Sequence, residues 1–293
     1  MQGQTLPLLI GVDGGGTGCR AAIAQMDGAV LGMSDGGPAN VTSNPVQAIE
    51  NIRAAIGSAA EAAGMAARLG RAHAYLGLAG AQSKAQRAQV ASAFDFARIE
   101  VAEDISSTVH GALGGRDGIV ISAGTGTIAA SLIGGVMRNV SGWGFHVSDQ
   151  ASGAWLGRAA LERALEAYDG LRAHSDLTRA LLLQFEDEPN AIARFASSAE
   201  PVDFAGFAPL VLAAAEAKDA VGRALMERGA DHICRAIGAL GDLEGSVCLT
   251  GGVGPSYAPF LPVAMQKRIV AAKGTALDGA LFLAGRGLTG VTA

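Results

Sequence analysis

Basic residues, aromatic residues and cysteines are all scarce in this sequence. Its 293 residues include 22 Lys and Arg against 27 Asp and Glu, and 5% are aromatic. The net charge of −5 argues against a general nucleic-acid binder, which needs a cationic surface for the phosphate backbone. The three cysteines, Cys19, Cys234 and Cys248, lie far apart and lack metal or iron–sulfur spacing. Their odd number is typical of a protein from the reducing cytoplasm.

Long hydrophobic runs of the kind that cross a membrane are missing as well. Residues 118–137 carry no charge, but they include five glycines. Buried strands joined by glycine turns fit this stretch better than a membrane span. No basic segment precedes the short apolar run of MQGQTLPLLI, so we expect no signal peptide.

Glycine, in contrast, is abundant, with 42 residues, and three glycine turns stand out. They lie in GVDGGGTGCRAAI (11–23), ISAGTGT (121–127) and LTGGV (249–253). Glycine here either makes a tight hairpin or lets a ligand approach the backbone closely. The first turn leads into another strand rather than a helix, and no Gly-Lys-Ser/Thr follows it. The turns are therefore neither a dinucleotide fingerprint nor a P-loop, but they could offer N–H groups to phosphates.

The order of the expected elements indicates an α/β fold with an internal duplication. Residues 6–13, 19–25 and 29–35 read as strands, with a hairpin at 26–28. Asn44 caps a helix that begins at Pro45. Further elements are strands at 72–80 and 98–104 and helices at 82–97 and 105–114. Near Gly114 and Gly115 the pattern restarts, with strand, glycine turn and strands over 117–142. A helical stretch (150–241), a strand (246–254), a helix (256–267), a strand (269–272) and a helix (275–285) follow.

Several motifs, in order, resemble those of the BadF/BadG/BcrA/BcrD-type ATPases of the actin, sugar-kinase and Hsp70 superfamily. They are GVDGGGTGCRAAI, GLAGA, AED, ISAGTGT, SGWGFHVSDQASGAWLG, LTGGV and ALDGALFLA. Within that group the chain looks most like the N-acetylglucosamine and glucosamine kinases. The resemblance implies two actin-like (ribonuclease H-like) domains with a nucleotide cleft between them. Residues 1–114, joined by 275–293, would form the first domain, and residues 115–274, with a helical insertion, the second.

The resemblance also implies ATP and Mg²⁺ as cofactors. Asp13 would hold Mg²⁺ through water. The nucleotide-binding residues it implies are Gly14, Gly15, Gly16, Thr17, Gly124, Thr125, Gly126, Thr127, Gly251, Gly252 and Val253. For the last three, a plain turn after the strand is the alternative.

Asp104 is the candidate general base for phosphoryl transfer, at the position of the family's catalytic Asp. The alternative is that Asp104 only caps the following helix. Relatives have Thr or Asn before this Asp and a small residue after it, whereas Glu103 and Ile105 stand here. Strand alternation would point Glu103, the rival base, to the opposite face.

The resemblance implies sugar contacts from four further residues. They are Asn40, Thr125, Trp143 and Asp149, which with Asp104 would bind the substrate. An ordinary turn residue is the alternative for Asn40. For Asp149 the alternative is the N-cap of a helix over 150–169.

The sequence thus predicts an ATP-dependent kinase for the 6-hydroxyl of N-acetylglucosamine or glucosamine. Its partners would be the aminosugar and ATP, with neither nucleic acid nor membrane, and the helical stretch 150–241 could pair two subunits. An ATPase activator of a radical dehydratase or reductase and a kinase for another hexose are the alternatives. The cysteine spacing disfavours the activator. A sugar-sensing regulator is disfavoured too, since we expect no helix-turn-helix before the first strand.

Overall fold

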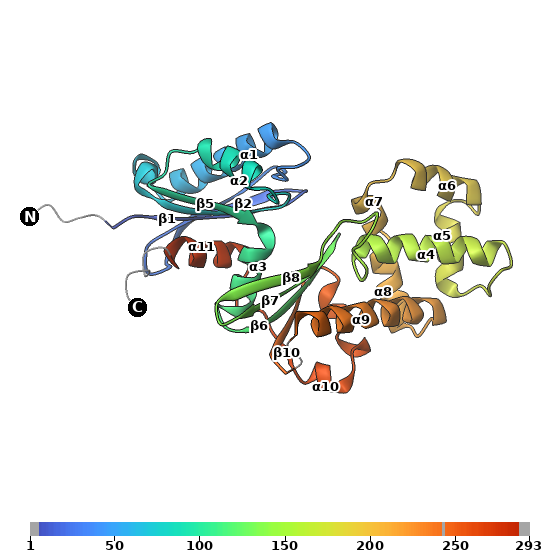
Figure 1. Cartoon of the computed structure of the whole chain (residues 1–293). Helices are drawn as coiled ribbons and strands as arrows, with labels where there is room; N and C mark the ends of the chain where they lie inside the picture. Colours follow the sequence, from blue (N-terminus) through green and yellow to red (C-terminus); the bar gives the residue numbers. More distant parts are fainter. Residues whose placement is uncertain (1–5, 242–243, 287–293) are drawn as a thin grey trace, which may run out of the picture. The chain divides into compact units, whose positions relative to one another are not determined.

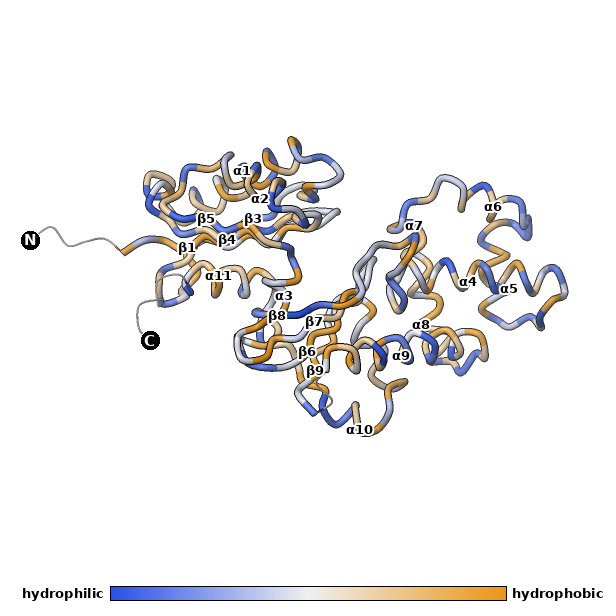
Figure 2. Tube along the Cα trace, in the orientation of Figure 1, coloured by the Kyte–Doolittle hydropathy of each residue, from blue (hydrophilic) through white to orange (hydrophobic). Residues whose placement is uncertain are grey.

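The computed structural model describes residues 6–241 and 244–286. The chain divides into two compact units, one made of Met1–Arg116 and Ala272–Ala293 and the other of Asp117–Ala271. Each unit holds one five-stranded sheet with helices packed on it (Figure 1). Hydropathy differs between inner and edge strands of the second sheet (Figure 2). The inner strands β6 and β9 are hydrophobic, whereas the edge strand β8 is largely hydrophilic.

The first sheet combines an antiparallel meander with two parallel strands. Its order is β3-β2-β1-β4-β5, in which β1, β2 and β3 run antiparallel and β4 and β5 run parallel to β1. The glycine turn at 15–18 therefore joins two neighbouring antiparallel strands, as predicted. The strands are β1 (Leu9–Gly14), β2 (Cys19–Ala24), β3 (Val30–Gly36), β4 (His73–Leu78) and β5 (Arg98–Glu103).

Helices cover both faces of this sheet. Alternate β1 residues point to opposite faces, so Ile10 packs in one core cluster with α1 and Leu9 in another with α11. Helix α1 begins where predicted, since the Asn44 side chain accepts the Gln47 N–H at 3.1 Å. The helical segments of this unit are α1 (Pro45–Ala62), η1 (Ala66–Arg71), α2 (Lys84–Ser92), α3 (Asp104–Leu113) and α11 (Ala276–Arg286).

Close packing of α11 on the sheet depends on a glycine in β1. A Cβ built on Gly11 would lie 2.9 Å from the backbone nitrogen of Leu281. Helix α11 also packs along α3. The face of the sheet that carries Asp13 is thus the face covered by these two helices.

The second sheet repeats the strand arrangement of the first. Its order is β10-β9-β6-β7-β8, with an antiparallel β6-β7-β8 meander, β9 parallel to β6 and β10 parallel to β9. The internal duplication predicted from the sequence is therefore present as a repeat of topology. The strands are β6 (Gly118–Ala123), β7 (Thr127–Ile133), β8 (Val136–Ser141), β9 (Val247–Thr250) and β10 (Ile269–Val270).

Most of the helical residues that the structure describes belong to the second unit. Buried residues of α4, α5, α8 and α9 form one large core cluster with Ile119 and Ile121 of β6. The helices are α4 (Gly153–Tyr168), α5 (Asp176–Gln184), α6 (Pro189–Ser198), α7 (Pro201–Ala205), α8 (Ala208–Glu216) and α9 (Ala220–Leu240). Within residues 6–241 and 244–286, no helix has the length and apolar character needed to cross a membrane.

The single helix predicted over residues 256–267 is wrong. The structure has a 3-10 helix, η2 (Gly254–Phe260), and a separate short helix, α10 (Val263–Gln266). Pro259 and Pro262 lack the N–H that an α-helix needs and break its continuity. The helix expected over 82–97 is likewise shorter, because α2 ends at Ser92.

Candidate functional site

Two candidate carboxylates lie at one edge of the first sheet. Strands β1, β4 and β5 run parallel, so their carboxyl ends meet at the same edge. Asp13 is the penultimate residue of β1, and Asp104 follows β5 directly. Carboxyl ends of parallel strands are the usual place for ligands in open α/β sheets.

Asp104 opens helix α3 and does not cap it. The N-cap position belongs to Glu103, whose side chain makes no capping hydrogen bond, so the N-cap alternative for Asp104 is wrong. Burial and the charge of Asp13 raise the pKa of the Asp104 carboxyl to about 6, against the opposing hydrogen bond from the Ile105 N–H. Glu103 adds a smaller repulsion. A carboxyl with a pKa near the working pH is suited to general acid–base chemistry.

Asp13 is held by an arginine from the neighbouring strand. Arg20 of β2 lies directly opposite Asp13 of β1 in the antiparallel register. Its Nη2 donates to Asp13 Oδ2 at 2.6 Å, and the two side chains are 45% and 20% exposed, respectively. The carboxylate is therefore already placed to hold a cation, and solvent can reach it.

In the first glycine turn, packing explains the glycine at position 14 but not those at positions 15 and 16. Gly14 is needed for packing, because a Cβ there would lie 2.6 Å from Leu78 Cδ2. A Cβ on Gly15 would meet only Gly18 O at 3.7 Å, and one on Gly16 would meet nothing within 4 Å. Neither Gly15 nor Gly16 has a positive φ. The fold itself thus gives no reason for glycine at 15 and 16.

The second glycine turn, in the other unit, is fixed to the N-terminus of α4. The N–H groups of Gly153 and Ala154 donate to the carbonyls of Gly124 and Thr125 at 2.7 and 3.3 Å. A Cβ on Gly124 would meet open space. The Thr127 hydroxyl is buried and has no hydrogen-bond partner among the residues that the structure describes.

Both turns present unused backbone donors. Among the described residues, no backbone carbonyl accepts the N–H of Gly16, Thr17, Thr125 or Gly126. Successive free N–H groups in a turn form a site for anions such as phosphate.

The buried Asp149 side chain accepts a hydrogen bond from the end of the second glycine turn, at Thr127. Asp149 is 7% exposed and has a left-handed backbone, with φ of 64°. Burial raises the pKa of its carboxyl, while hydrogen bonds from the N–H groups of Thr127 and Gly144 oppose that change. The alternative that Asp149 caps the next helix is wrong, since Ser152 is the N-cap of α4 and accepts the Trp155 N–H at 3.0 Å.

The remaining sugar candidates differ in exposure and hydrogen bonding. Trp143 is 80% exposed, in the same loop as Asp149. Asn40 makes a local turn, because its Oδ1 accepts the N–H groups of Thr42 and Ser43 at 2.9 and 3.2 Å. The side-chain amide nitrogen of Asn40 makes no hydrogen bond within the described part of the chain.

The third glycine turn follows β9. Gly251 has φ of 82°, and a Cβ there would clash with the carbonyl of Ala123, so the backbone itself requires glycine. A Cβ on Gly252 would meet nothing within 4 Å. Val253 is buried and donates its N–H to Ala123 O at 2.9 Å.

The structure thus brings the predicted residues together in two sets, one in each unit. Asp13, the 14–17 turn, Asn40 and Asp104 belong to the first unit. Thr125 with its turn, Trp143, Asp149 and the 251–253 turn belong to the second.

Sequence reasoning missed one residue near Asp13. Asp35 of β3 lies directly opposite Arg20 and lines a hollow of about 440 Å³ with Asp13 and Gly15. The two hairpins of the β1-β2-β3 meander were predicted. A register counted outward from the 26–28 hairpin would have placed Ser34 opposite Arg20, because an irregularity between Ile23 and Ala24 shifts the pairing by one residue.

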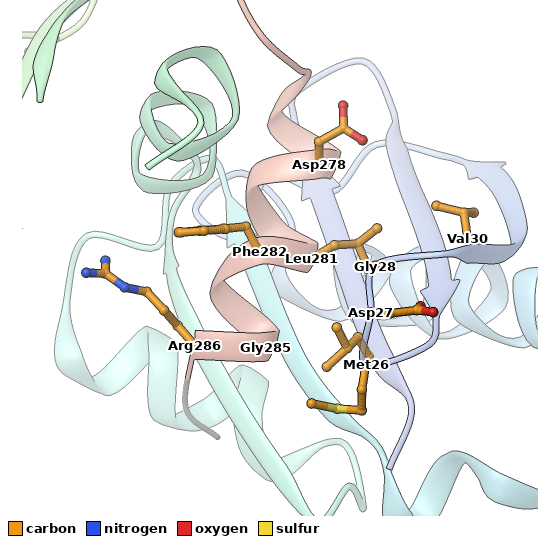
Figure 3. A pocket seen from close by; sticks show the side chains of 10 residues that line it. Met26, Asp27, Gly28, Val30, Asp278, Leu281, Phe282, Gly285 and Arg286 are labelled. Atoms are coloured by element: carbon orange, nitrogen blue, oxygen red, sulfur yellow. The ribbon is translucent and has the colours of Figure 1, made fainter. Parts of the chain in front are cut away.

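A second hollow of about 450 Å³ contains none of the predicted residues. Figure 3 shows it between α11, with Leu281 and Phe282, and the β2–β3 hairpin, with Met26. Its lining is largely apolar, and its charged residues are Asp27, Asp278 and Arg286.

The model of the BadF/BadG/BcrA/BcrD ATPase family matches residues 10–276. Glucosamine kinase GspK of Vibrio cholerae is 32% identical over 280 residues, which are 94% of this chain and 95% of that protein. The crystal structure of a protein provisionally named N-acetylglucosamine kinase, from Chromobacterium violaceum, superimposes with a TM-score of 0.88. It is 35% identical and covers 95% of this chain and 99% of its own.

A glucokinase of the ROK family from Streptomyces griseus shares the fold at a TM-score of 0.56. It is 18% identical, and the match covers 96% of this chain and 98% of that one. The two-sheet α/β fold is therefore the fold of the actin-like sugar kinases, as predicted. The chain belongs to the BadF/BadG/BcrA/BcrD ATPase family.

Proposed function

We propose that the protein is an ATP-dependent kinase that transfers a phosphoryl group to the 6-hydroxyl of an aminosugar, glucosamine or N-acetylglucosamine. Family membership supports the use of ATP. The names of the Vibrio cholerae and Chromobacterium violaceum proteins support an aminosugar as acceptor.

The observation that carries this proposal is the pair of glycine turns with open space above the backbone. Gly15, Gly16 and Gly124 meet little or nothing where a Cβ would lie, so the fold alone does not require glycine there. Among the described residues, the free N–H groups of each turn and the Thr127 hydroxyl have no partner, and phosphate oxygens would accept from them. We assign Gly14–Thr17 and Gly124–Thr127 to the phosphates, and Gly251, Gly252 and Val253 to the adenosine.

Asp104 acts in this mechanism as the general base. Its carboxylate takes the proton of the sugar hydroxyl as that oxygen attacks the terminal phosphorus of ATP. The raised pKa makes this carboxylate a better proton acceptor than an ordinary Asp, while it stays largely ionised above pH 6. The helix that Asp104 opens fixes the position of the carboxylate relative to the strand edge.

Asp13 is the proposed Mg²⁺ residue, and its surroundings fit that ion. Mg²⁺ in kinases is usually held by one or two carboxylates, water and the substrate phosphates. Asp13 supplies one partly exposed carboxylate, and the described residues form no cluster of three or more acidic, His or Cys ligands. When bound, the ion would neutralise charge on the phosphates.

Four further residues are assigned to the sugar. Trp143 offers an exposed aromatic side chain. The Asn40 amide N–H₂, which makes no hydrogen bond to any described residue, can donate to a sugar hydroxyl. Thr125 lies on the second turn, and Asp149 joins that turn to the loop of Trp143. We propose that Asp149 accepts a sugar hydroxyl while keeping the turn in place. We also assign the actin-like domains to residues 1–114 with 275–293 and to residues 115–274.

A coupled assay of ADP release tests the proposal. The purified protein is mixed with Mg²⁺–ATP and, separately, glucosamine, N-acetylglucosamine, N-acetylmannosamine, glucose or mannose. We expect ADP release that depends on glucosamine or N-acetylglucosamine, with a kcat/KM well above that for glucose. ADP release that is the same with and without any sugar would overturn the kinase assignment.

A further inference from the structure

Three charged side chains form a row across the first meander. Asp13, Arg20 and Asp35 are direct cross-strand neighbours on β1, β2 and β3. Directly opposed residues in an antiparallel sheet share a face, so Arg20 lies between Asp13 and Asp35 on one face of the sheet. It is bonded to Asp13, while the exposed Asp35 makes no ion pair within the part of the chain that the structure describes.

The arginine occupies one oxygen of the carboxylate that we assign to the metal. Its Nη2 lies 2.6 Å from Asp13 Oδ2, at the rim of the hollow beside the first glycine turn. With its side chain 45% exposed, Arg20 makes a pair of the kind that stabilises a protein only weakly. The pair can therefore open at small cost when a stronger cation arrives.

We propose that Arg20 neutralises Asp13 in the metal-free protein and moves to Asp35 when Mg²⁺ binds together with the nucleotide. Arg20 is then a positioning residue that competes with the metal, and Asp35 is its second partner. The inference rests on the proposed metal role of Asp13. Without Arg20, the bare Asp13 carboxylate would repel the phosphates whenever the metal is absent.

Isothermal titration calorimetry with ADP tests this inference without turnover. The dissociation constant is measured in EDTA and in excess Mg²⁺, and the ratio of the two values is the metal enhancement. The variants are Arg20→Gln, Arg20→Lys, Asp35→Asn and Asp13→Asn, each checked for folding by circular dichroism.

We expect Arg20→Gln to weaken ADP binding in EDTA by roughly three- to tenfold and to leave binding in Mg²⁺ nearly unchanged, so that the metal enhancement rises. Arg20→Lys keeps the charge and should stay within about twofold of the wild type. Asp35→Asn removes the second partner, so binding in Mg²⁺ should weaken by roughly two- to threefold. In the Arg20→Gln background, Asp35→Asn should have no such effect.

An equal loss of affinity with and without Mg²⁺ in Arg20→Gln would overturn the inference, because Arg20 would then contact the nucleotide in both states. Unchanged affinity in both conditions would overturn it too. Asp13→Asn separates this failure from that of the proposed function. If Asp13→Asn leaves the metal enhancement intact, the metal assignment itself is wrong, whatever Arg20 does.

Discussion

Replacing Asp104 by Asn removes a charge and a proton acceptor but keeps the shape of the side chain. The amide oxygen can still accept the Ile105 N–H that the carboxylate accepts now. The surroundings of Asp104 raise the pKa of its carboxyl from the ordinary value of 3.8 to about 6, mainly through burial and the charge of Asp13. The ionised form is therefore less favourable in the folded protein than in the unfolded chain.

Because the pKa of Asp104 is higher in the folded protein than in the unfolded chain, its ionisation lowers the free energy of unfolding. Well below pH 3.8 the carboxyl is protonated in both the folded and the unfolded state, so it does not change the free energy of unfolding. The cost develops as the pH rises from 3.8 to about 6 and is complete above that range. A difference of about 2 in pKa corresponds to at most on the order of 3 kcal/mol, and residual solvent access makes the true cost smaller. Asp104→Asn should thus raise the free energy of unfolding at pH 7.5, and raise it much less at pH 4.5.

Activity should change in the opposite direction. Without a proton acceptor, kcat should fall by on the order of 10²-fold or more. In the wild type, kcat/KM should fall as the pH drops below about 6, since protonation disables the base. Urea unfolding at the two pH values and steady-state kinetics with a fixed sugar measure both effects. Near-normal turnover of the variant would remove Asp104 from the mechanism, and an equal stability change at both pH values would refute the electrostatic reasoning.

Three further predictions concern a turn, a core hydroxyl and a helix cap. Gly16→Ala should fold normally, because its Cβ meets nothing within 4 Å, but calorimetry should show ATP binding weakened by about tenfold or more. The matched control is Gly57→Ala in α1, where a Cβ also meets nothing within 4 Å, and this variant should bind ATP as the wild type does. Tyr257→Phe removes a buried hydroxyl that has no partner among the described residues, so thermal unfolding should show a stability equal to that of the wild type or up to about 1 kcal/mol higher. A clear loss of stability would mean that the hydroxyl has a partner. Ser152→Ala loses the cap of α4 and should lower the free energy of unfolding by about 1 kcal/mol in urea titrations, with no change if the cap is dispensable.

Much of the fold was predictable because its signals are local. The hairpin at 26–28 follows from a glycine, Gly28, with φ of 89° in the structure. The start of α1 follows from Asn44 and Pro45, whose capping geometry depends on neighbouring residues alone. The repeated meander follows from apolar strands separated by glycine turns. The single helix expected over 256–267 is wrong because Pro259 and Pro262 interrupt it, which is also a local signal.

The sequence predicts which residues form the candidate site better than it predicts the contacts that those residues make. Asp13 and the first glycine turn are recognisable from the sequence, since they follow an apolar strand. The hydrogen bonds of Asp149 to Thr127 and Gly144 depend on how a loop folds back onto a turn some twenty residues earlier. No local pattern encodes that approach, so Asp149 was interpreted only as a sugar ligand or a helix cap. Ser152, the cap of α4, was a local signal that the sequence reasoning missed, because its side chain accepts the N–H of Trp155 only three residues on.

Phosphorus NMR of the reaction product tests the central claim most directly. The protein is incubated with Mg²⁺–ATP and either glucosamine or N-acetylglucosamine, and the proton-coupled ³¹P spectrum of the product is recorded. A phosphate on the 6-oxygen is attached to a carbon that carries two protons, so we predict a new phosphomonoester signal split into a triplet. A doublet would place the phosphate on a ring carbon with a single proton and contradict the 6-hydroxyl assignment. Signals of ADP and inorganic phosphate without any sugar phosphomonoester, with either sugar, would contradict the assignment of the protein as an aminosugar kinase.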